Sequence, residues 1–206
     1  MTLEPLKSLF AGHKPVEIPW RRFLPRAAVA VVFRNPGPEI LFIKRSERAD
    51  DPWSGDMAFP GGRMEPGDGS PMSTALRELF EETGIGGDAE IRPVGRLSDV
   101  PTRTHAGFPP MTVTPYALEL SGEPNFTDNH EVRERLWVPL DFFLDAANRT
   151  TMIWRFIGRN WTVPCYNYEG RRIWGLSLIV MDEVIALARG ERPGARAWML
   201  RLAHKI

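Results

Sequence analysis

The segment whose structure is most constrained by the sequence is residues 71–83, because it carries a helix signal at each end. Ser70 is a suitable N-cap, and Pro71 suits the first helical position, where an N–H group is not needed. Gly84 follows the last turn and is a typical helix stop. The sequence therefore predicts a helix over residues 71–83.

Three glutamates share one face of this predicted helix. Glu78, Glu81 and Glu82 are three and four residues apart, and like charges at that spacing oppose helix formation by roughly 0.2–0.5 kcal/mol. The cluster is either a solvated acidic face or a cradle for a cation. The Gly61–Gly62 pair lets backbone carbonyls approach a bound group, Arg77 can orient a carboxylate, and Mg²⁺ prefers carboxylate and phosphate oxygens. We therefore favour the metal cradle.

The remaining pattern predicts one α/β domain. With 206 residues, 43% of them apolar and 25% charged, the chain can bury one core of ordinary size. We expect strands at residues 27–33, 40–45, 89–100, 110–120, in a segment ending near Val138, and at 154–175. We expect helices around 2–10, from Pro139, over 176–189 with an amphipathic pattern, and at 194–205. Residues 1–26 are predicted to be an N-terminal extension and residues 27–206 the domain.

Charge and cysteine content narrow the kinds of partner. Lys plus Arg and Asp plus Glu both number 26, so the totals give no support for a nucleic-acid or anionic-membrane binder. No apolar run reaches the roughly 18 residues of a membrane span. The one cysteine, Cys165, rules out an internal disulfide and favours a reducing, cytoplasmic compartment. We interpret it as a buried thiol rather than a catalytic one.

The segments G-R-M-E-P-G-D (62–68) and R-E-L-F-E-E-T-G-I (77–85) resemble the Nudix box. This box is the signature of hydrolases that cleave nucleoside diphosphates linked to another moiety. The resemblance implies a Nudix-type α/β/α sandwich with a mixed β-sheet, and possible homodimers, as in many family members.

Two departures from the box are similar to its coenzyme A diphosphatase branch. Asp68 stands where the family usually has glutamate, and eight residues rather than seven separate it from Arg77. Residues 131–144 and 171–184 also resemble that branch. The arginine of its upstream signature would fall at Asp51, with Arg48 the nearest candidate.

The resemblance also implies a metal site and a mechanism. The implied ligands of Mg²⁺ or Mn²⁺ are Glu78, Glu81, Glu82 and the carbonyl of Gly61. Arg77 would hold the carboxylates, and the metal would bridge the diphosphate and activate a water. The general base is open: Glu81 is the first choice and Glu131 the second, with His130 and Glu134 in the same loop.

Substrate recognition must come from outside the box. Aromatic side chains could stack on a base or a pantetheine arm, and arginines could bind phosphates, although each is as easily explained by packing. The candidates are Arg45, Arg48, Trp53, Arg103, Phe108 and Tyr166.

We expect coenzyme A or its derivatives as the leading substrate. ADP-ribose or another nucleotide diphosphate is the alternative within the same chemistry. A non-catalytic nucleotide sensor would be favoured by loss of a box glutamate, and none is missing. A prenyl diphosphate isomerase would need a cysteine before the box, whereas the single cysteine is at position 165.

Overall fold

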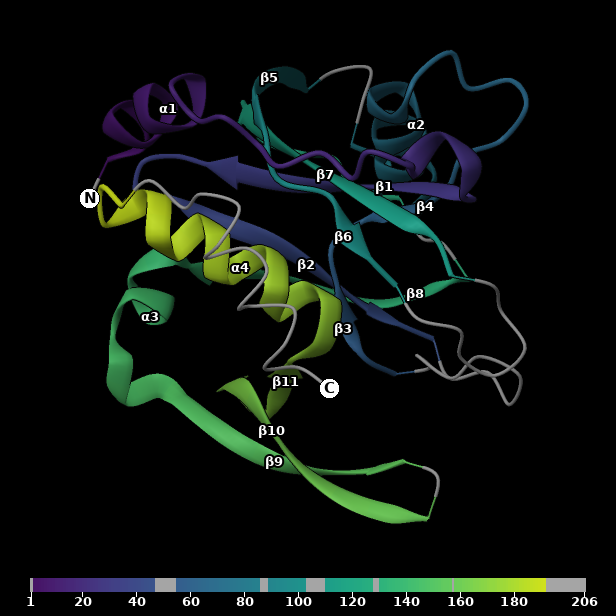
Figure 1. Ribbon diagram of the computed structural model, residues 1–206. Coiled ribbons are helices and arrows are strands. Elements are labelled where there is room, and N and C mark those ends of the chain that lie inside the picture. The colour runs from purple at the N-terminus through teal and green to yellow at the C-terminus, as the bar shows by residue number, and fades with distance from the viewer. Residues whose placement is uncertain are drawn as a thin grey trace.

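The computed structural model describes residues 2–46, 55–85, 89–102, 110–127, 130–156 and 158–191. Its main feature is a mixed sheet (Figure 1). In the described residues this sheet has the order β3-β2-β1-β7-β5, with β4 paired to β1, β6 to β7 and β8 to β2. The strands are β1 (Arg26–Arg34), β2 (Glu39–Arg45), β3 (Met57–Ala58), β4 (Gly61–Arg63), β5 (Glu90–Arg96), β6 (Val100–Pro101), β7 (Thr112–Ser121) and β8 (Val132–Pro139).

Strand β1 explains why the fold has three layers. It pairs in parallel with β7 and antiparallel with β2 and β4, so the sheet is mixed. Because side chains alternate along a strand, Ala28, Ala30 and Val32 pack toward one face. Val31 and Phe33 pack toward the other. Both faces are therefore apolar and must be covered.

Helices cover both faces, as Figure 1 shows. The α-helices are α1 (Leu3–Ala11), α2 (Pro71–Thr83), α3 (Leu140–Leu144) and α4 (Gly175–Ala188), and the 3₁₀ turns are η1 (Arg21–Phe23) and η2 (Ala146–Asn148). Helix α2 packs on one face through Ala75 and Leu79. Helices α1 and α4 share the core cluster of the opposite face. The expected α/β/α sandwich with a mixed sheet is confirmed.

A second, antiparallel sheet projects from this body (Figure 1). It consists of β9 (Arg149–Phe156), β10 (Arg159–Tyr168) and β11 (Arg171–Ile173), in the order β11-β10-β9. We call the β9–β10 hairpin the ribbon.

Most expected elements are confirmed, with three corrections. The strand expected at 89–100 is interrupted after Arg96, because residues 97–99 belong to neither β5 nor β6 and Asp99 is buried there. The strands expected at 154–175 begin earlier, at Arg149. Helix α4 is not amphipathic but buried on nearly all sides, since α1, β3, β6 and β10 surround it. The helix expected at 194–205 lies outside the described residues.

The N-terminal segment packs into the main core. Leu3, Leu6 and Phe10 of α1 are almost fully buried, and the Phe10 ring lies 5.5 Å from that of Phe33. Division of the chain at residues 26 and 27 stays a prediction, but α1 contributes to the same apolar cluster as the sheet.

Candidate active site

Helix α2 forms where local signals predict it. The Ser70 hydroxyl accepts a hydrogen bond from the Ser73 N–H at 3.1 Å, and the Ser73 hydroxyl accepts one from the Ser70 N–H at 2.9 Å. At the other end Gly84 has a left-handed backbone with φ 73°, which favours glycine. The helix therefore holds its acidic side chains in a defined register against β4.

Arg77 is the centre of the polar network on this helix. Its Nε and Nη2 donate to the two oxygens of Asp68, both at 3.0 Å. Its Nη1 donates to Glu81 at 2.9 Å and forms an ion pair with Glu78 at 3.0 Å. Nη2 also donates to the Arg63 carbonyl at 3.1 Å. One guanidinium thus joins the loop after β4, the strand itself and two helix carboxylates.

Asp68 has a structural role that the sequence did not reveal. Its carboxylate also accepts the Glu65 N–H at 2.9 Å and the Thr74 hydroxyl at 3.0 Å. Hydrogen bonding from Arg77 holds the pKa of Asp68 well below its ordinary range, so it stays ionised. The residue that departs from the family pattern therefore ties the loop over residues 64–70 to α2. In the sequence, only the position of Asp68 before Arg77 pointed to this role.

The two glycines allow α2 to lie directly against β4. A Cβ on Gly62 would sit 2.2 Å from Glu78 Oε1, and one on Gly61 would sit 2.4 Å from the Ala28 carbonyl oxygen. The Gly61 N–H donates to Glu82 Oε2 at 2.8 Å. Any larger residue at either glycine would displace a helix carboxylate or the sheet.

Glu82 is the most buried of these acids, with 4% of its surface exposed. Burial raises its pKa to about 8, and the charge of Glu78 adds to the rise, although the Gly61 N–H and the charge of Arg45 oppose it. Burial likewise raises the pKa of Glu78, aided by the charge of Glu81. For both carboxylates the effect of burial outweighs that of the neighbouring positive charges, Arg77 for Glu78 and Arg45 for Glu82, which act to lower the pKa.

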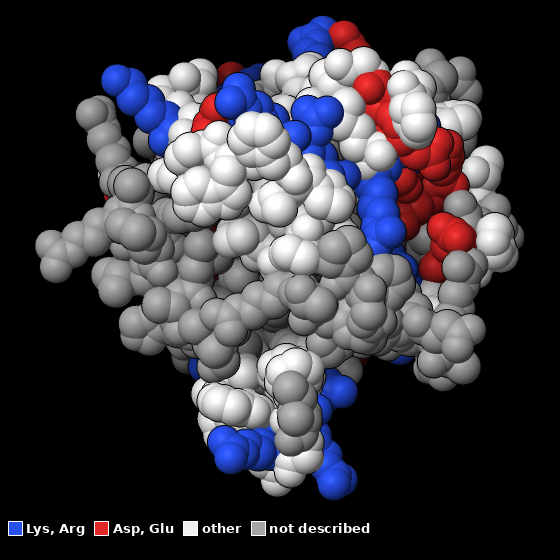
Figure 2. All heavy atoms as spheres, turned by 45° about the vertical axis from the view of Figure 1, so that its right-hand side comes forward, with Lys and Arg blue, Asp and Glu red and all other residues white. Residues whose placement is uncertain are grey.

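We call Glu78, Glu81 and Glu82 the acidic cluster. Figure 2 shows acidic side chains gathered in one patch on this face, with Lys or Arg side chains beside it. Among the residues that the structure describes, no group of His, Cys, Asp and Glu is already arranged to enclose a metal. The donors nevertheless suit Mg²⁺ or Mn²⁺, which take oxygen ligands. A bound cation would offset the free-energy cost of burying the charged form of Glu82.

The structure brings one of the proposed loop bases toward the cluster. The Ser46 N–H donates to the Glu131 carbonyl at 2.9 Å, and the charge of Glu131 contributes to the raised pKa of Glu82. His130 is exposed and 3.8 Å from Glu131. Glu134 pairs instead with Arg171, which lowers its pKa and makes it a weaker base.

Few of the substrate-binding candidates can be placed. Arg45 ends β2, its N–H donates to the Asp56 carbonyl at 3.1 Å, and its charge reaches Glu82. Four further candidates lie outside the described residues: Arg48, Trp53, Arg103 and Phe108.

The stacking role considered for Tyr166 is wrong. Its ring is buried, lies 5.0 Å from that of Phe143, and its hydroxyl donates to the Phe143 carbonyl at 3.3 Å. Since packing and a hydrogen bond already satisfy this side chain, it belongs to the core. Cys165 is buried, as expected.

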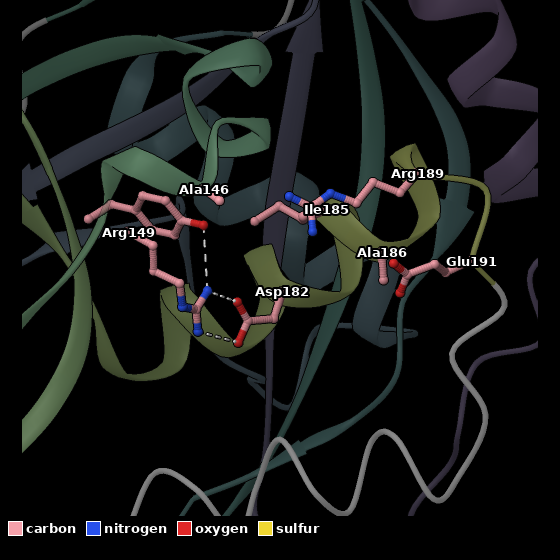
Figure 3. A pocket seen from close by; sticks show the side chains of 8 residues that line it. Ala146, Arg149, Asp182, Ile185, Ala186, Arg189 and Glu191 are labelled. Atoms are coloured by element: carbon pink, nitrogen blue, oxygen red, sulfur yellow. Dashed lines mark hydrogen bonds and ion pairs between the residues drawn. The ribbon is translucent and has the colours of Figure 1, made fainter.

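A separate pocket lies beside α4 (Figure 3). Arg149 pairs there with Asp182 at 2.6 Å, and Arg189 donates to the Leu144 carbonyl at 3.1 Å. No member of the acidic cluster lines this pocket, and these charged groups are already engaged within the protein. We therefore place the candidate site at the acidic cluster.

Comparison with known proteins agrees with this placement. The NUDIX domain family matches residues 24–157, a range that includes β4, the loop after it and the whole of α2. The chain belongs to the Nudix family. Proteins described as uncharacterized Nudix hydrolase NudL, from Yersinia pestis and Yersinia pseudotuberculosis, are 31% identical over 158 residues, which is 76% of this chain and 76% of theirs.

Two solved structures illustrate the wider resemblance. An Ap4A hydrolase from C. elegans has a TM-score of 0.47 and 20% identity, covering 59% of this chain and 84% of its own. The Nudix domain of Shewanella oneidensis NrtR, complexed with ADP ribose, has a TM-score of 0.46 and 23% identity, covering 59% and 76%.

The domain match and the NudL relatives make this Nudix protein a hydrolase of diphosphate linkages. Nudix hydrolases generally use divalent metal ions. Within the described part of the chain, no helix has the length and apolar character needed to cross a membrane.

Proposed function

We propose that this Nudix hydrolase cleaves the diphosphate of coenzyme A or a coenzyme A derivative, with Mg²⁺ as its metal and Mn²⁺ as a substitute. The observation that carries the proposal is the acidic cluster. Two of its carboxylates, those of Glu78 and Glu82, lie against the Gly61–Gly62 pair, and burial raises their pKa values. Such an arrangement is unfavourable alone and becomes favourable around a cation.

The proposed ligands are Glu78, Glu81, Glu82 and the Gly61 carbonyl. A bound ion would lower the pKa of a water and offset charge on the phosphoryl oxygens. Arg77 orients two of the carboxylates through the contacts described above.

Proton transfer and substrate binding are assigned to neighbouring side chains. Glu81 is half exposed and accepts the proton of the attacking water, with Glu131 as the second candidate. Arg45, whose positive charge acts on Glu82, binds a substrate phosphate. Arg48, Trp53, Arg103 and Phe108 stay predictions for recognition of the rest of the substrate.

Coenzyme A is preferred because Asp68 and its spacing from Arg77 resemble the coenzyme A diphosphatase branch. ADP-ribose or another nucleotide diphosphate is the alternative substrate. A sensor without activity is disfavoured, because all three box glutamates are present and Arg77 contacts two of them, Glu78 and Glu81. Homodimer formation and a cytoplasmic location stay predictions.

Product analysis tests this proposal. The protein with Mg²⁺ is incubated with coenzyme A, acetyl-coenzyme A, ADP-ribose, NADH, diadenosine polyphosphates and nucleoside-diphosphate sugars. Release of 3′,5′-ADP from coenzyme A, lost in Glu82→Gln and kept in the matched surface variant Glu90→Gln, is the expected result. Cleavage of a different compound in place of coenzyme A would keep the hydrolase activity and assign another substrate. No cleavage of any compound, with nucleotide binding retained, would favour a sensor.

A further inference from the structure

The turn before β1 exposes two aromatic rings to solvent. Phe23 is 74% exposed and Trp20 is 61% exposed, which makes them the most exposed aromatic side chains of the described residues. Phe23 ends η1, and Trp20 is the residue that caps its start. In Figure 1 this turn is the purple coil on the right, at the outer edge of the body. Neighbouring exposed apolar side chains, unlike isolated ones, mark an interaction surface.

Contacts with the body fix the conformation of this turn. The Phe23 N–H donates to the Trp20 carbonyl at 3.0 Å. The Arg21 side chain forms ion pairs with Glu17 at 2.9 Å and with Asp99 at 3.4 Å, and Asp99 is fully buried. The two rings are therefore held in solvent by a turn that is anchored to the body of the protein.

The same segment carries an excess of positive charge. Leaving histidine aside, the charged side chains over residues 13–26 are the cationic Lys14, Arg21, Arg22 and Arg26 and the acidic Glu17. The balanced totals of 26 cationic and 26 acidic residues in the whole chain therefore hide a local excess.

Two of these arginines are available to a partner. Arg22 and Arg26 are exposed, and within the part of the chain that the structure describes neither forms an ion pair. The guanidinium carbon of Arg22 lies 4.7 Å from the centre of the Phe23 ring. We call Trp20, Arg22, Phe23 and Arg26 the aromatic–basic turn.

The surface of an anionic membrane matches both properties of this turn. Tryptophan rings favour the boundary between lipid headgroups and acyl chains, and arginine keeps its charged end at the phosphates while its stem contacts apolar groups. An acidic protein surface would match the arginines but not the rings, and an apolar protein pocket would match only the rings. Single-stranded nucleic acid needs free ring faces for base stacking, whereas the Arg22 guanidinium already covers one face of Phe23.

We propose that the aromatic–basic turn docks this protein on the surface of an anionic phospholipid membrane. Trp20 and Phe23 enter the boundary between headgroups and acyl chains, and Arg22 and Arg26 contact lipid phosphates. A contact of this size gives weak, reversible association that depends on anionic lipid. The docking is peripheral, and it is independent of which diphosphate the acidic cluster cleaves.

Cosedimentation of the full chain with vesicles tests this inference. The wild type should bind vesicles of phosphatidylcholine with phosphatidylglycerol about tenfold or more tightly than vesicles of phosphatidylcholine alone. Trp20→Ala/Phe23→Ala should weaken binding to the anionic vesicles by about tenfold or more, and Arg22→Gln/Arg26→Gln by about fivefold for each arginine. Ile153→Ala is the matched control, because it removes an apolar side chain of the same 61% exposure from the ribbon, and it should bind as the wild type does.

The other possible partners are separate outcomes of the same set of variants. Equal urea midpoints for all variants would show that the fold is intact, since every substituted side chain is exposed. Equal binding to the two kinds of vesicle, or anionic binding that survives both double variants, would overturn the proposal. A dimer that dissociates in Trp20→Ala/Phe23→Ala, without vesicle binding by the wild type, would identify the turn as a subunit contact and overturn it. Binding of a single-stranded oligonucleotide in place of vesicles would overturn it as well.

Discussion

The clearest physical prediction concerns Glu82→Gln in the metal-free protein. Burial raises the pKa of Glu82 from an ordinary value of 4.5 to about 8. The folded state therefore keeps a proton that the unfolded chain releases between these two values. Stability is complete below pH 4.5 and falls as the pH rises toward 8, because the folded state binds more protons than the unfolded state in that window.

The magnitude follows from the distance between the working pH and the unfolded pKa. At pH 7 this distance is about 2.5 units, which corresponds to about 3 kcal/mol of lost stability. At pH 5 the loss is below about 1 kcal/mol. Glutamine does not ionise and still offers an oxygen to the Gly61 N–H, which now donates to Glu82 at 2.8 Å. The variant should therefore be more stable than the wild type by up to about 3 kcal/mol at pH 7, with little difference at pH 5.

Urea unfolding with EDTA at pH 5 and pH 7 measures this difference, with Glu90→Gln as the exposed control. Adding Mg²⁺ to about 100 times its dissociation constant should stabilise the wild type by about 2.7 kcal/mol and the Glu82→Gln variant by much less. If both proteins lose stability equally between pH 5 and pH 7, Glu82 does not carry the buried proton and the reasoning is refuted.

Two further substitutions probe the contacts around the cluster. Gly62→Ala should lower kcat by about tenfold or more, because its Cβ would sit 2.2 Å from Glu78 Oε1 and must displace that carboxylate. Gly67→Ala, with nothing within 4 Å of its Cβ, is the control in the same rate assay, and equal rates for the two variants would contradict the close packing. Arg77→Lys should lose about 1–3 kcal/mol in urea unfolding, because lysine cannot reproduce the paired hydrogen bonds to Asp68; an unchanged midpoint would count against that role.

Local signals explain which parts of the fold were predictable. Helix α2 has the boundaries expected of it because Ser70 and Gly84 act on their own neighbours. The continuous apolar run over residues 27–33 likewise predicted a buried strand, which the structure has as β1. These features depend on contacts between residues close in the sequence, so the sequence alone is sufficient to predict them.

Other features depend on residues far apart in the sequence. The strand expected at 89–100 ends early because Asp99 is buried, accepting the Ile18 N–H at 3.0 Å and the Thr114 hydroxyl at 2.9 Å. Neither partner is visible from the local pattern. Tyr166 failed as a stacking candidate for a similar reason, since a buried aromatic and a ligand-binding one have the same sequence signature.

The candidate site shows the same division. The family motif pointed to the acidic side chains, but the contact between Arg77 and the Arg63 carbonyl required the loop after β4 to fold back. The contact between the rings of Trp154 and Trp174 was also invisible from the local pattern, because the two residues are twenty positions apart in the sequence.

The central claim is that the acidic cluster binds a metal and hydrolyses a diphosphate. The most direct measurement is the initial rate of 3′,5′-ADP release from coenzyme A as Mg²⁺ is titrated, for the wild type, Glu82→Gln and Glu90→Gln. We predict a saturable dependence on Mg²⁺ for the wild type and Glu90→Gln, and a loss of roughly 100-fold for Glu82→Gln. Full activity in Glu82→Gln, or activity that is unaffected by EDTA, would contradict the account.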